Sequence, residues 1–235
     1  AIISRPSNFF LGFTVVLNTF GVLAILAILY MLIRRYVVRS AYLQGMGDDL
    51  LALLWILVIL LSGHFLQSLR LAALQPPWAP WSFASYGLAR LFWDTSPESL
   101  AKIHIVVWWF HFLLVMAWIA WLPFGKLMHI FTGPLNLYMR SAKPRGRIEK
   151  MDLEDEEAES YGVAQIGDLH WKKLMESDAC IRCGRCQENC PAKLTEKPLN
   201  PKEVILSVRG KMEEAYRLRG KGGEEGKSLV GEWIT

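Results

Sequence analysis

The sequence predicts an all-α membrane protein whose membrane-spanning part is followed by a small polar segment. Three runs lack Asp, Glu, Lys and Arg altogether, at residues 9–33, 50–69 and 103–125. Each is long enough to cross about 30 Å of hydrocarbon as a helix. Charge divides the chain in the same way, because residues 1–139 carry eight basic and four acidic side chains, whereas residues 140–235 carry eighteen of each. All four cysteines lie in the polar part.

The apolar runs predict membrane helices over about 9–33, 50–74 and 102–131, within a membrane domain of residues 1–139. Helices are expected because a segment surrounded by lipid must satisfy its backbone hydrogen bonds internally. Buried helices of a soluble protein are the alternative. The net charge of +4 belongs entirely to this domain. It therefore bears on membrane topology and gives no indication of nucleic-acid binding.

Basic residues next to the predicted helices indicate their orientation. They follow the first and third helices, as Arg34, Arg35, Arg39, Arg140, Lys143, Arg145, Arg147 and Lys150. The segment between the second and third helices is poorer in basic residues and rich in Pro and Trp, as an interfacial loop would be. The positive-inside rule therefore predicts that the N-terminus lies outside and that the C-terminal segment is cytoplasmic.

The polar part divides into a linker at residues 140–167 and a cysteine-containing region at residues 168–235. The acidic run at residues 152–159 is expected to be a solvated connector. The glycine-rich stretch at residues 220–227 has Lys where a phosphate-binding loop needs Gly, and no strand precedes it. It therefore does not fit a nucleotide-binding loop.

Two short helices are expected on either side of the cysteines. Asp168 is a candidate cap for a helix through Leu174, which would lead the chain to the first cysteine. After the last cysteine, Asn200 and Pro201 are a typical N-cap and first helical residue, and this helix is expected to run to about Arg209.

The cysteines have the spacing of a bacterial ferredoxin cluster motif. They are Cys180, Cys183, Cys186 and Cys190, followed directly by Pro191. This C-x2-C-x2-C-x3-C-P run is a [4Fe–4S] motif, and Gly184 fits the tight turn inside it. Structural zinc is the alternative, but tetrahedral zinc sites usually take their cysteines from separated pairs. Redox disulfide chemistry would need only one pair.

The fourth cysteine carries further information. In two-cluster proteins with this spacing, the fourth Cys of one run ligates the other cluster. The chain has a single run, so Cys190 either completes the cluster locally or ligates a second cluster whose own run lies elsewhere. We favour the second interpretation, in which the cluster region is incomplete at its C-terminal end.

Four of the five histidines lie in or beside the predicted membrane helices, where ionisable side chains are costly and usually functional. His111 and His129 are eighteen residues apart. In one continuous helix they would face the same direction, about 27 Å apart along the axis. This arrangement suits one haem ligand near each side of the bilayer. The fifth histidine, His170, lies in the polar part and is expected to be structural.

His64 and His104 are weaker candidates for haem ligation. His64 lies at a depth in the second helix similar to that of His111 in the third, so the two could hold one haem between adjacent helices. His104 is seven residues before His111, on nearly the same helical face. Each membrane histidine could instead hydrogen-bond a neighbouring helix.

Three polar residues follow His64 near the predicted outer surface: Gln67, Ser68 and Arg70. Gln67 and Arg70 are candidates for binding a quinone carbonyl, and Arg70 could equally pair with a haem propionate. A simple interfacial anchor is the alternative interpretation.

With these residues assembled, the chain resembles a known family. This family joins a cytochrome b that is similar to the respiratory nitrate reductase gamma subunit to an iron–sulfur region that is similar to the heterodisulfide reductase D subunit. The membrane part of the resemblance lies in His104, His111 and the motif at residues 123–136, and the polar part lies in residues 171–174, 178–186 and 197–202. Together these motifs cover most of residues 100–210, and their combination is more specific than either part.

The resemblance implies a cytochrome b-like bundle with one or two b haems and a small ferredoxin-like [4Fe–4S] region in a prokaryotic cytoplasmic membrane. By position, His111 and His129 match the family's two haem ligands on its last membrane helix. Relatives of this kind link electron-transfer flavoprotein or sulfite-reduction proteins to menaquinone. The expected partners are therefore a membrane quinone and a cytoplasmic redox partner or catalytic module.

The chain also departs from the family pattern. The family has about five membrane helices, a second cysteine run, and cysteine-rich CCG domains that carry the catalytic or substrate-linked cluster. Three membrane helices and one run are found here. The sequence thus resembles a fragment, or one component of a multi-subunit complex.

The leading hypothesis is an electron-transfer subunit of a quinone-linked membrane oxidoreductase, of the heterodisulfide reductase or electron-transfer-flavoprotein:quinone type, rather than a complete enzyme. It would relay electrons between the quinone pool, b-type haem and a cytoplasmic [4Fe–4S] cluster. The alternative is a non-haem membrane anchor that docks a ferredoxin-like cluster domain to a partner enzyme.

Overall fold

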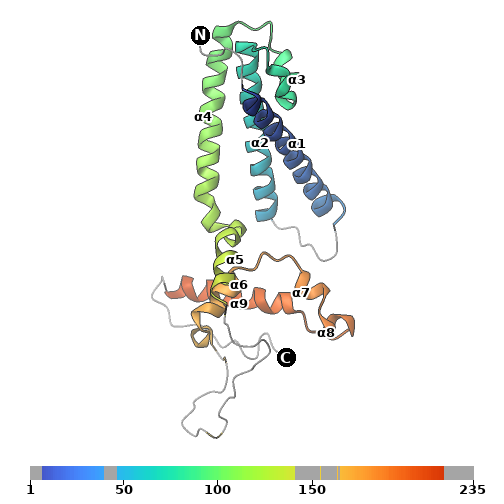
Figure 1. Cartoon of the computed structure of the whole chain (residues 1–235). Helices are drawn as coiled ribbons and strands as arrows, with labels where there is room; N and C mark the ends of the chain where they lie inside the picture. The colour runs from blue at the N-terminus through green and yellow to red at the C-terminus, as the bar shows by residue number, and fades with distance from the viewer. Residues whose placement is uncertain (1–6, 40–46, 141–153, 155–162, 164, 220–235) are drawn as a thin grey trace. The chain divides into compact units, whose positions relative to one another are not determined.

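The computed structural model describes residues 7–39, 47–140, 154, 163 and 165–219, and within these ranges it contains helices and no strand (Figure 1). The all-α prediction is confirmed. The chain forms two compact units, and the first ends at Gly125 where the second continues from Lys126. The basic residues from Lys143 to Lys150, most of the acidic run and the glycine-rich stretch all lie outside the described residues.

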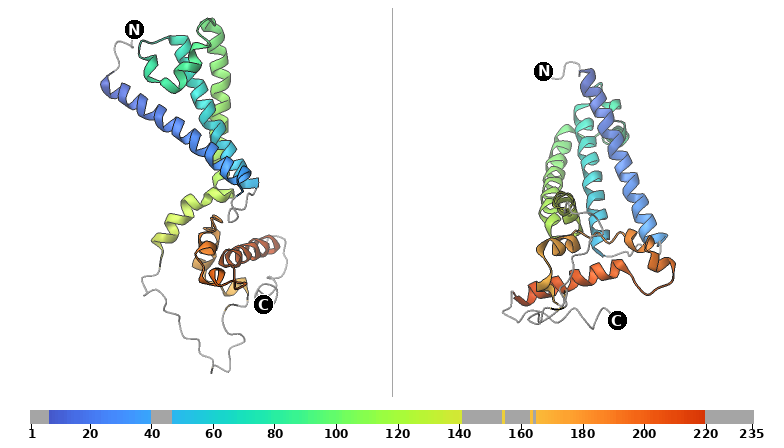
Figure 2. Two further views of the ribbon diagram at one scale, coloured as in Figure 1. Left: turned by 90° about the vertical axis from the view of Figure 1, so that its right-hand side faces the viewer. Right: turned by 60° about the horizontal axis from the view of Figure 1, so that its bottom comes forward.

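Among the described residues, three helices are long and apolar enough to cross a membrane, all of them in the first unit, which agrees with the number expected. They are α1 (Asn8–Leu32), extended by the π-helical turn η1 (Ile33–Val37), α2 (Gly47–Leu74) and α4 (Pro97–Trp121). In Figure 1 and in the right-hand view of Figure 2, α2 lies between α1 and α4. Most large apolar side chains of α1 and α4 are exposed, as expected for surfaces that face lipid or further helices.

Local sequence fixes where two of these helices begin. Ser7 caps α1 by accepting a hydrogen bond from the backbone N–H of Phe10 at 3.2 Å. Ser96 caps α4, and Pro97 occupies its first turn, where the missing N–H costs nothing. At the opposite end of α1, Arg35 forms an ion pair with Asp49 of α2, and both side chains are largely buried. Breaking this pair would leave an uncompensated charge, so it links the two helices firmly.

The segment after α2 is more ordered than an interfacial loop. It contains the 3-10 turn η2 (Ala79–Trp81) and the helix α3 (Phe83–Arg90), which packs against α2. The buried core of the first unit lies here, formed by Leu69, Leu71, Ala72, Ala79, Ala89 and Leu100. This packing brings the hydroxyls of α3 against one face of α2, where they contact the polar residues predicted from the sequence.

The expected continuous helix over residues 102–131 is wrong. The α-helix ends at Trp121 and is followed by two 3-10 turns, η3 (Leu122–Phe124) and η4 (Lys126–Met128), before α5 (His129–Tyr138) begins. Pro123 lacks a backbone donor and clashes with a continuing helix. Gly125 is extended, and a Cβ atom there would lie 2.9 Å from the Trp121 ring. His111 and His129 therefore belong to different helices and do not share one helical face.

The second unit packs α5 against α6 (Trp171–Asp178), which in turn packs against α9 (Pro201–Arg219). Two short helices lie between α6 and α9, namely α7 (Arg185–Glu188) and α8 (Pro191–Leu194). The sequence placed the end of the membrane domain at residue 139, whereas α5 packs with the cysteine-containing region. The helix α5 therefore belongs to the second unit, although its residues were assigned to the membrane domain from the sequence.

Caps in the second unit agree only partly with expectation. Asn200 caps α9 as predicted, because its Oδ1 accepts from the N–H groups of Lys202 and Glu203. The helix continues to Arg219, well beyond the expected end. The cap of α6 is His170, whose Nδ1 accepts from the N–H of Lys172 at 3.3 Å. Asp168 instead closes the preceding 3-10 turn by accepting from the N–H of Gln165.

Candidate functional site

The loop between α6 and α7 holds Cys180 and Cys183 and curls sharply, and Cys186 follows in α7. Gly184 has a left-handed backbone with φ of 76°, which confirms the turn expected there, and Arg182 is also left-handed with φ of 57°. Two left-handed residues in so short a stretch turn the chain back on itself, and the α7 helix starts directly after Gly184. The backbone thus has the curvature that a loop around a cluster requires.

The four thiols are free and at least partly accessible. Cys183 and Cys186 are exposed, whereas Cys180 and Cys190 are half-buried, and Cys190 caps α8 immediately before Pro191. Among the residues that the structure describes, no group of three or more His, Cys, Asp or Glu side chains could hold a single metal ion. A cubane cluster has a different requirement, because each thiolate ligates its own iron.

Arg209 of α9 binds the backbone at the start of this loop, a role that the sequence did not indicate. Its Nη1 donates to the backbone carbonyls of Asp178 and Cys180, at 3.4 and 3.3 Å. Its Nη2 lies 3.3 Å from the Asp178 carboxylate, and its Nε donates to Glu213 at 3.1 Å. The guanidinium therefore fixes the backbone on both sides of Ala179. These partners are far apart in sequence, so only the folded chain reveals them.

A charged cluster ties α5 to α6. Lys172 donates from Nζ to the Asn136 carbonyl at 3.3 Å, to the Asn136 side chain and to Glu176 at 3.1 Å. Lys173 donates to the other carboxylate oxygen of Glu176 at 2.9 Å. Burial raises the pKa of Glu176, but the hydrogen bonds and charges of the two lysines outweigh burial and lower the pKa below its usual 4.5.

This lowered pKa predicts an acid-dependent contribution to stability. Because the Glu176 pKa is lower in the folded protein, its stabilising effect is complete above the unfolded value near 4.5 and is lost as pH falls through the folded value. We expect Glu176→Gln to lower the unfolding temperature of the chain at pH 6 to 7, with the difference from the unsubstituted protein shrinking below about pH 4.5. Thermal unfolding followed by circular dichroism across this pH range measures both effects, and a difference independent of pH would contradict the assignment.

His129 lies at the start of α5, against the cysteine loop. Its Nδ1 is 2.6 Å from the backbone carbonyl oxygen of Ala179. A carbonyl only accepts, so Nδ1 carries the proton and donates, which leaves Nε2 as the nitrogen with the free lone pair. Gly133 lies one turn later, and a Cβ atom there would come within 3.0 to 3.3 Å of the imidazole. Glycine at this position leaves space on that side of the ring.

His111 of α4 also carries its proton on Nδ1, but its hydrogen-bond acceptor is a serine hydroxyl. The Ser62 hydroxyl donates its proton to the Ile59 carbonyl at 3.0 Å, so its oxygen accepts from His111 Nδ1 at 2.8 Å. Nε2 again carries the lone pair. A histidine that ligates a metal almost always donates its other N–H to a protein acceptor, which fixes the tautomer and the orientation of the ring. His111 and His129 both satisfy this requirement.

His64 of α2 belongs to a chain of hydrogen bonds with α3. Its Nδ1 lies 3.0 Å from Ser85, which donates to Gln67 at 2.9 Å, and Gln67 in turn donates to Ser82 at 3.1 Å. His64 therefore donates from Nδ1, as the other two histidines do. Its Nε2 faces α1, however, where a Cβ atom on Gly21 would lie only 2.6 Å away. In this arrangement α1 covers the nitrogen that would ligate a metal.

The contact between Gly21 and His64 predicts a clear difference between two glycines of α1. Gly21→Ala forces the imidazole away and breaks its bond to Ser85, so we expect a loss of about 1–3 kcal/mol, as for other overpacked sites. Gly12→Ala is the control, because a Cβ atom there meets nothing within 4 Å and alanine favours helix. Thermal unfolding in detergent compares the variants, and equal stability of the two would contradict the packing described.

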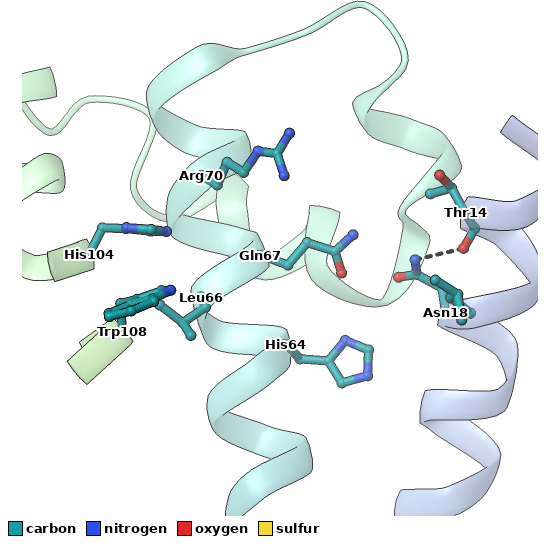
Figure 3. Close-up of a pocket in the computed structure, with 9 residues that line it drawn as sticks. Thr14, Asn18, His64, Leu66, Gln67, Arg70, His104 and Trp108 are labelled. Atoms are coloured by element: carbon teal, nitrogen blue, oxygen red, sulfur yellow. Dashed lines mark hydrogen bonds between the residues drawn. The ribbon is translucent and has the colours of Figure 1, made fainter. Parts of the chain in front are cut away.

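A cavity of about 400 Å³ opens across one face of α2 (Figure 3). Its polar lining comes from three helices: Thr14 and Asn18 of α1, His64, Gln67 and Arg70 of α2, and His104 of α4. Four residues singled out from the sequence therefore meet at one cavity, namely His64, Gln67, Arg70 and His104. Ser68 does not, because it is fully buried and donates to the Phe65 carbonyl.

Asn18 is the member of this cavity that the sequence did not predict. Its side chain is only 3% exposed, and its Nδ2 donates to the Thr14 carbonyl at 2.9 Å. This bond fixes the orientation of the amide, because in the flipped orientation the amide oxygen of Asn18 would face the carbonyl oxygen of Thr14. The amide oxygen then points toward α2 (Figure 3) and has no hydrogen-bond partner. A buried acceptor without a partner is costly, which favours a ligand that donates to it.

The site residues predicted from the sequence thus lie in two different units of the structure. The cavity of the first unit holds the polar residues of α2 and His104, and His111 lies on α4 against Ser62. His129 and Cys180 line a second cavity of about 400 Å³ in the other unit, together with Arg140 and Lys172.

Two family models match the chain. The model described as nitrate reductase gamma subunit matches residues 3–144, and the model described as 4Fe-4S binding domain matches residues 171–192. The first covers more than half of the chain, and the second includes all four cysteines. These matches confirm the two-part resemblance drawn from the sequence, with an iron–sulfur region after the membrane part.

Three curated relatives match this chain over different lengths. The EtfAB:quinone oxidoreductase of Syntrophomonas wolfei is 37% identical over 215 residues, which is 85% of this chain and 29% of that protein. The probable iron-sulfur-binding oxidoreductase FadF of Bacillus subtilis is 34% identical over 54% of this chain and 18% of its own length. The dihydromethanophenazine:CoB–CoM heterodisulfide reductase of Methanosarcina barkeri has a D subunit that is 44% identical over 52 residues, or 21% of this chain and 13% of its own.

The matched segment spans less than a third of each of these relatives. No solved structure matches the chain.

Proposed function

Because this chain belongs to the nitrate reductase gamma subunit family, we propose that it relays electrons between the quinone pool, b-type haem and a cytoplasmic [4Fe–4S] cluster. At a coarser level, the chain is a membrane-anchored iron–sulfur subunit of an electron-transfer oxidoreductase. The observation that carries the proposal is that His111 and His129 each have Nδ1 hydrogen-bonded to a fixed acceptor, which leaves the lone pair on Nε2.

We assign haem ligation to His111 and His129. A bound b-type haem would supply reversible one-electron exchange at its iron. The residues present fit such a group, because each imidazole is held by a hydrogen bond from Nδ1 to a serine or a carbonyl oxygen. His64 and His104 follow them as candidates. The contact of His64 Nε2 with Gly21 favours a role for His64 in the polar cavity.

The cluster is assigned to Cys180, Cys183, Cys186 and Cys190. The curled loop carries Cys180 and Cys183, Cys186 lies in α7, and Cys190 caps α8. We retain the interpretation that Cys190 ligates a second cluster, whose own cysteine run would lie in another part of the complex. The expected partner is therefore a cytoplasmic redox module with that cluster and CCG domains.

The cavity with Asn18, Gln67 and Arg70 is the proposed quinone site. Its volume is within the range of small-molecule sites. Asn18 offers an acceptor to a quinol hydroxyl, and the Arg70 guanidinium offers donors to an oxygen at the other end of the ring. Quinol oxidation releases two electrons and two protons, so a site that binds the reduced form suits electron entry from the membrane.

A substitution at Asn18 tests the quinone site. Asn18→Leu removes the acceptor. The quinol concentration that gives half of the maximal rate of reduction should therefore rise about fivefold, which corresponds to one hydrogen bond of about 1 kcal/mol. The measurement is the rate of reduction in membranes after addition of a soluble menaquinol analogue. Thr19→Leu is the control, since Thr19 lies next to Asn18 but is exposed. Equal effects of the two substitutions would argue against this cavity as the quinone site.

The same membranes distinguish the proposal from its rival. A non-haem anchor would contain iron and acid-labile sulfide but show no b-type absorption band after reduction.

The proposed topology places the N-terminus outside and the cluster in the cytoplasm of a prokaryotic cell. It rests on the basic residues around the membrane helices, such as Arg34 and Arg35.

A further inference from the structure

We propose that His129 is a positioning residue for the iron–sulfur cluster, acting through the backbone carbonyl of Ala179. Ala179 directly precedes Cys180, so one hydrogen bond and one peptide unit connect the imidazole to the first cluster ligand. The inference rests on the proposed ligation by Cys180 and does not require that His129 bind haem.

The contact is short and protected. The His129 Nδ1 and the Ala179 oxygen are 2.6 Å apart, and Ala179 is only 8% exposed. A hydrogen bond is electrostatically stronger where water is excluded. The carbonyl also lies at the C-terminal end of α6, where backbone oxygens have no partner within the helix. The imidazole N–H satisfies one of these oxygens and opposes the negative end of the helix dipole.

Two helices share the task of holding this backbone. Arg209 of α9 donates to the carbonyls of Asp178 and Cys180, and His129 of α5 donates to the carbonyl between them. Three consecutive carbonyls are thus held by side chains. Fixing three successive peptide planes sets the direction in which the Cys180 side chain leaves the backbone.

The contact also joins the two parts of the chain that match different families. His129 lies within the nitrate reductase gamma match at residues 3–144, whereas Ala179 and Cys180 lie within the 4Fe-4S match at residues 171–192. Hydrogen-bond donors and their dipoles near a cluster are among the factors that set its reduction potential. The N–H of His129 should therefore influence the cluster whether or not Nε2 carries a ligand.

Three variants of the full chain in membranes separate positioning from haem binding. His129→Leu removes both ring nitrogens. His129→Asn keeps an amide N–H near the place of Nδ1 but has nothing at Nε2. His111→Leu removes the other proposed haem ligand and leaves the cluster loop untouched. The readouts are the midpoint potential and the EPR spectrum of the reduced cluster, with iron content measured in each sample.

The inference predicts a shifted potential and an altered EPR spectrum in His129→Leu, while His129→Asn and His111→Leu match the unsubstituted chain. Equal shifts in all three variants would show that the effect comes from loss of haem and would overturn it. An unchanged cluster in His129→Leu would overturn it as well. If wild-type membranes lack a b-type band but His129→Leu still shifts the cluster, the haem proposal fails and this inference stands.

A second substitution covers the case in which His129→Leu does not accumulate. Arg209→Gln removes the bonds to the two neighbouring carbonyls while keeping α9 polar at that position. It should shift the cluster potential in the same direction as His129→Leu. An Arg209→Gln cluster with an unchanged potential and EPR spectrum would contradict the idea that these carbonyls position Cys180.

Discussion

Replacing Cys183 by alanine is expected to abolish the iron–sulfur cluster. Cys183 is exposed at the middle of the curled loop, and the left-handed residues Arg182 and Gly184 flank it. Without its thiolate one iron of the cubane loses its protein ligand, and the other three cysteines of the run are needed for their own sites. Iron and acid-labile sulfide should fall to background, and the EPR signal of the reduced protein should disappear.

Lys193→Ala is a suitable control for this experiment. Lys193 lies just beyond the run and pairs with Glu188 at the surface, so its loss should leave iron content unchanged. Tightly bound zinc in place of iron in the unsubstituted chain would refute the cluster assignment. Cys190→Ala adds a separate comparison, because retention of part of the iron would favour ligation of a second cluster by Cys190.

Loss of b-type haem from the His111→Leu variant is the second large effect we expect. In the proposed arrangement the imidazole would ligate the haem iron and Ser62 would only orient it, so leucine would remove the ligand itself. Redox-difference spectra of membranes should lose at least half of the b-type α-band in His111→Leu. The band should be absent when His129 is replaced as well.

His170→Ala is the matched control for haem, since His170 caps α6 and lies outside the membrane helices. It should keep the full α-band although it loses a cap worth about 1 kcal/mol. A band of full height in the His111→Leu and His129→Leu double variant would refute the assignment of both ligands.

Much of the fold follows from length and composition alone. Uncharged runs of 20 residues or more have few alternatives to membrane helices, so their number was predictable. The cysteine spacing was equally informative, because iron–sulfur chemistry restricts where ligands can lie in a loop. Asn200 could also be identified as a cap, since a capping side chain acts on the N–H groups that follow it.

The features that sequence reasoning missed depend on distant parts of the chain. Hydropathy stays high through residues 119–124, so it gave no sign that the helix ends at Trp121, although Pro123 was the local warning. Ser85 and Arg209 gain their roles only from partners brought close by packing. Asn18 is a polar residue in an apolar run, but only the fold reveals that its oxygen is buried without a partner.

The break after α4 has a consequence for chimeric proteins built from this family. An exchange of cluster regions between relatives would naturally be cut near residue 140, where the polar sequence begins. Such a cut would separate α5 from α6, so that one partner in each of the His129–Ala179 and Lys172–Asn136 contacts would come from another protein. A cut between Gly125 and Lys126 keeps them together. The unit that can be transplanted between proteins therefore begins inside the membrane family's own sequence.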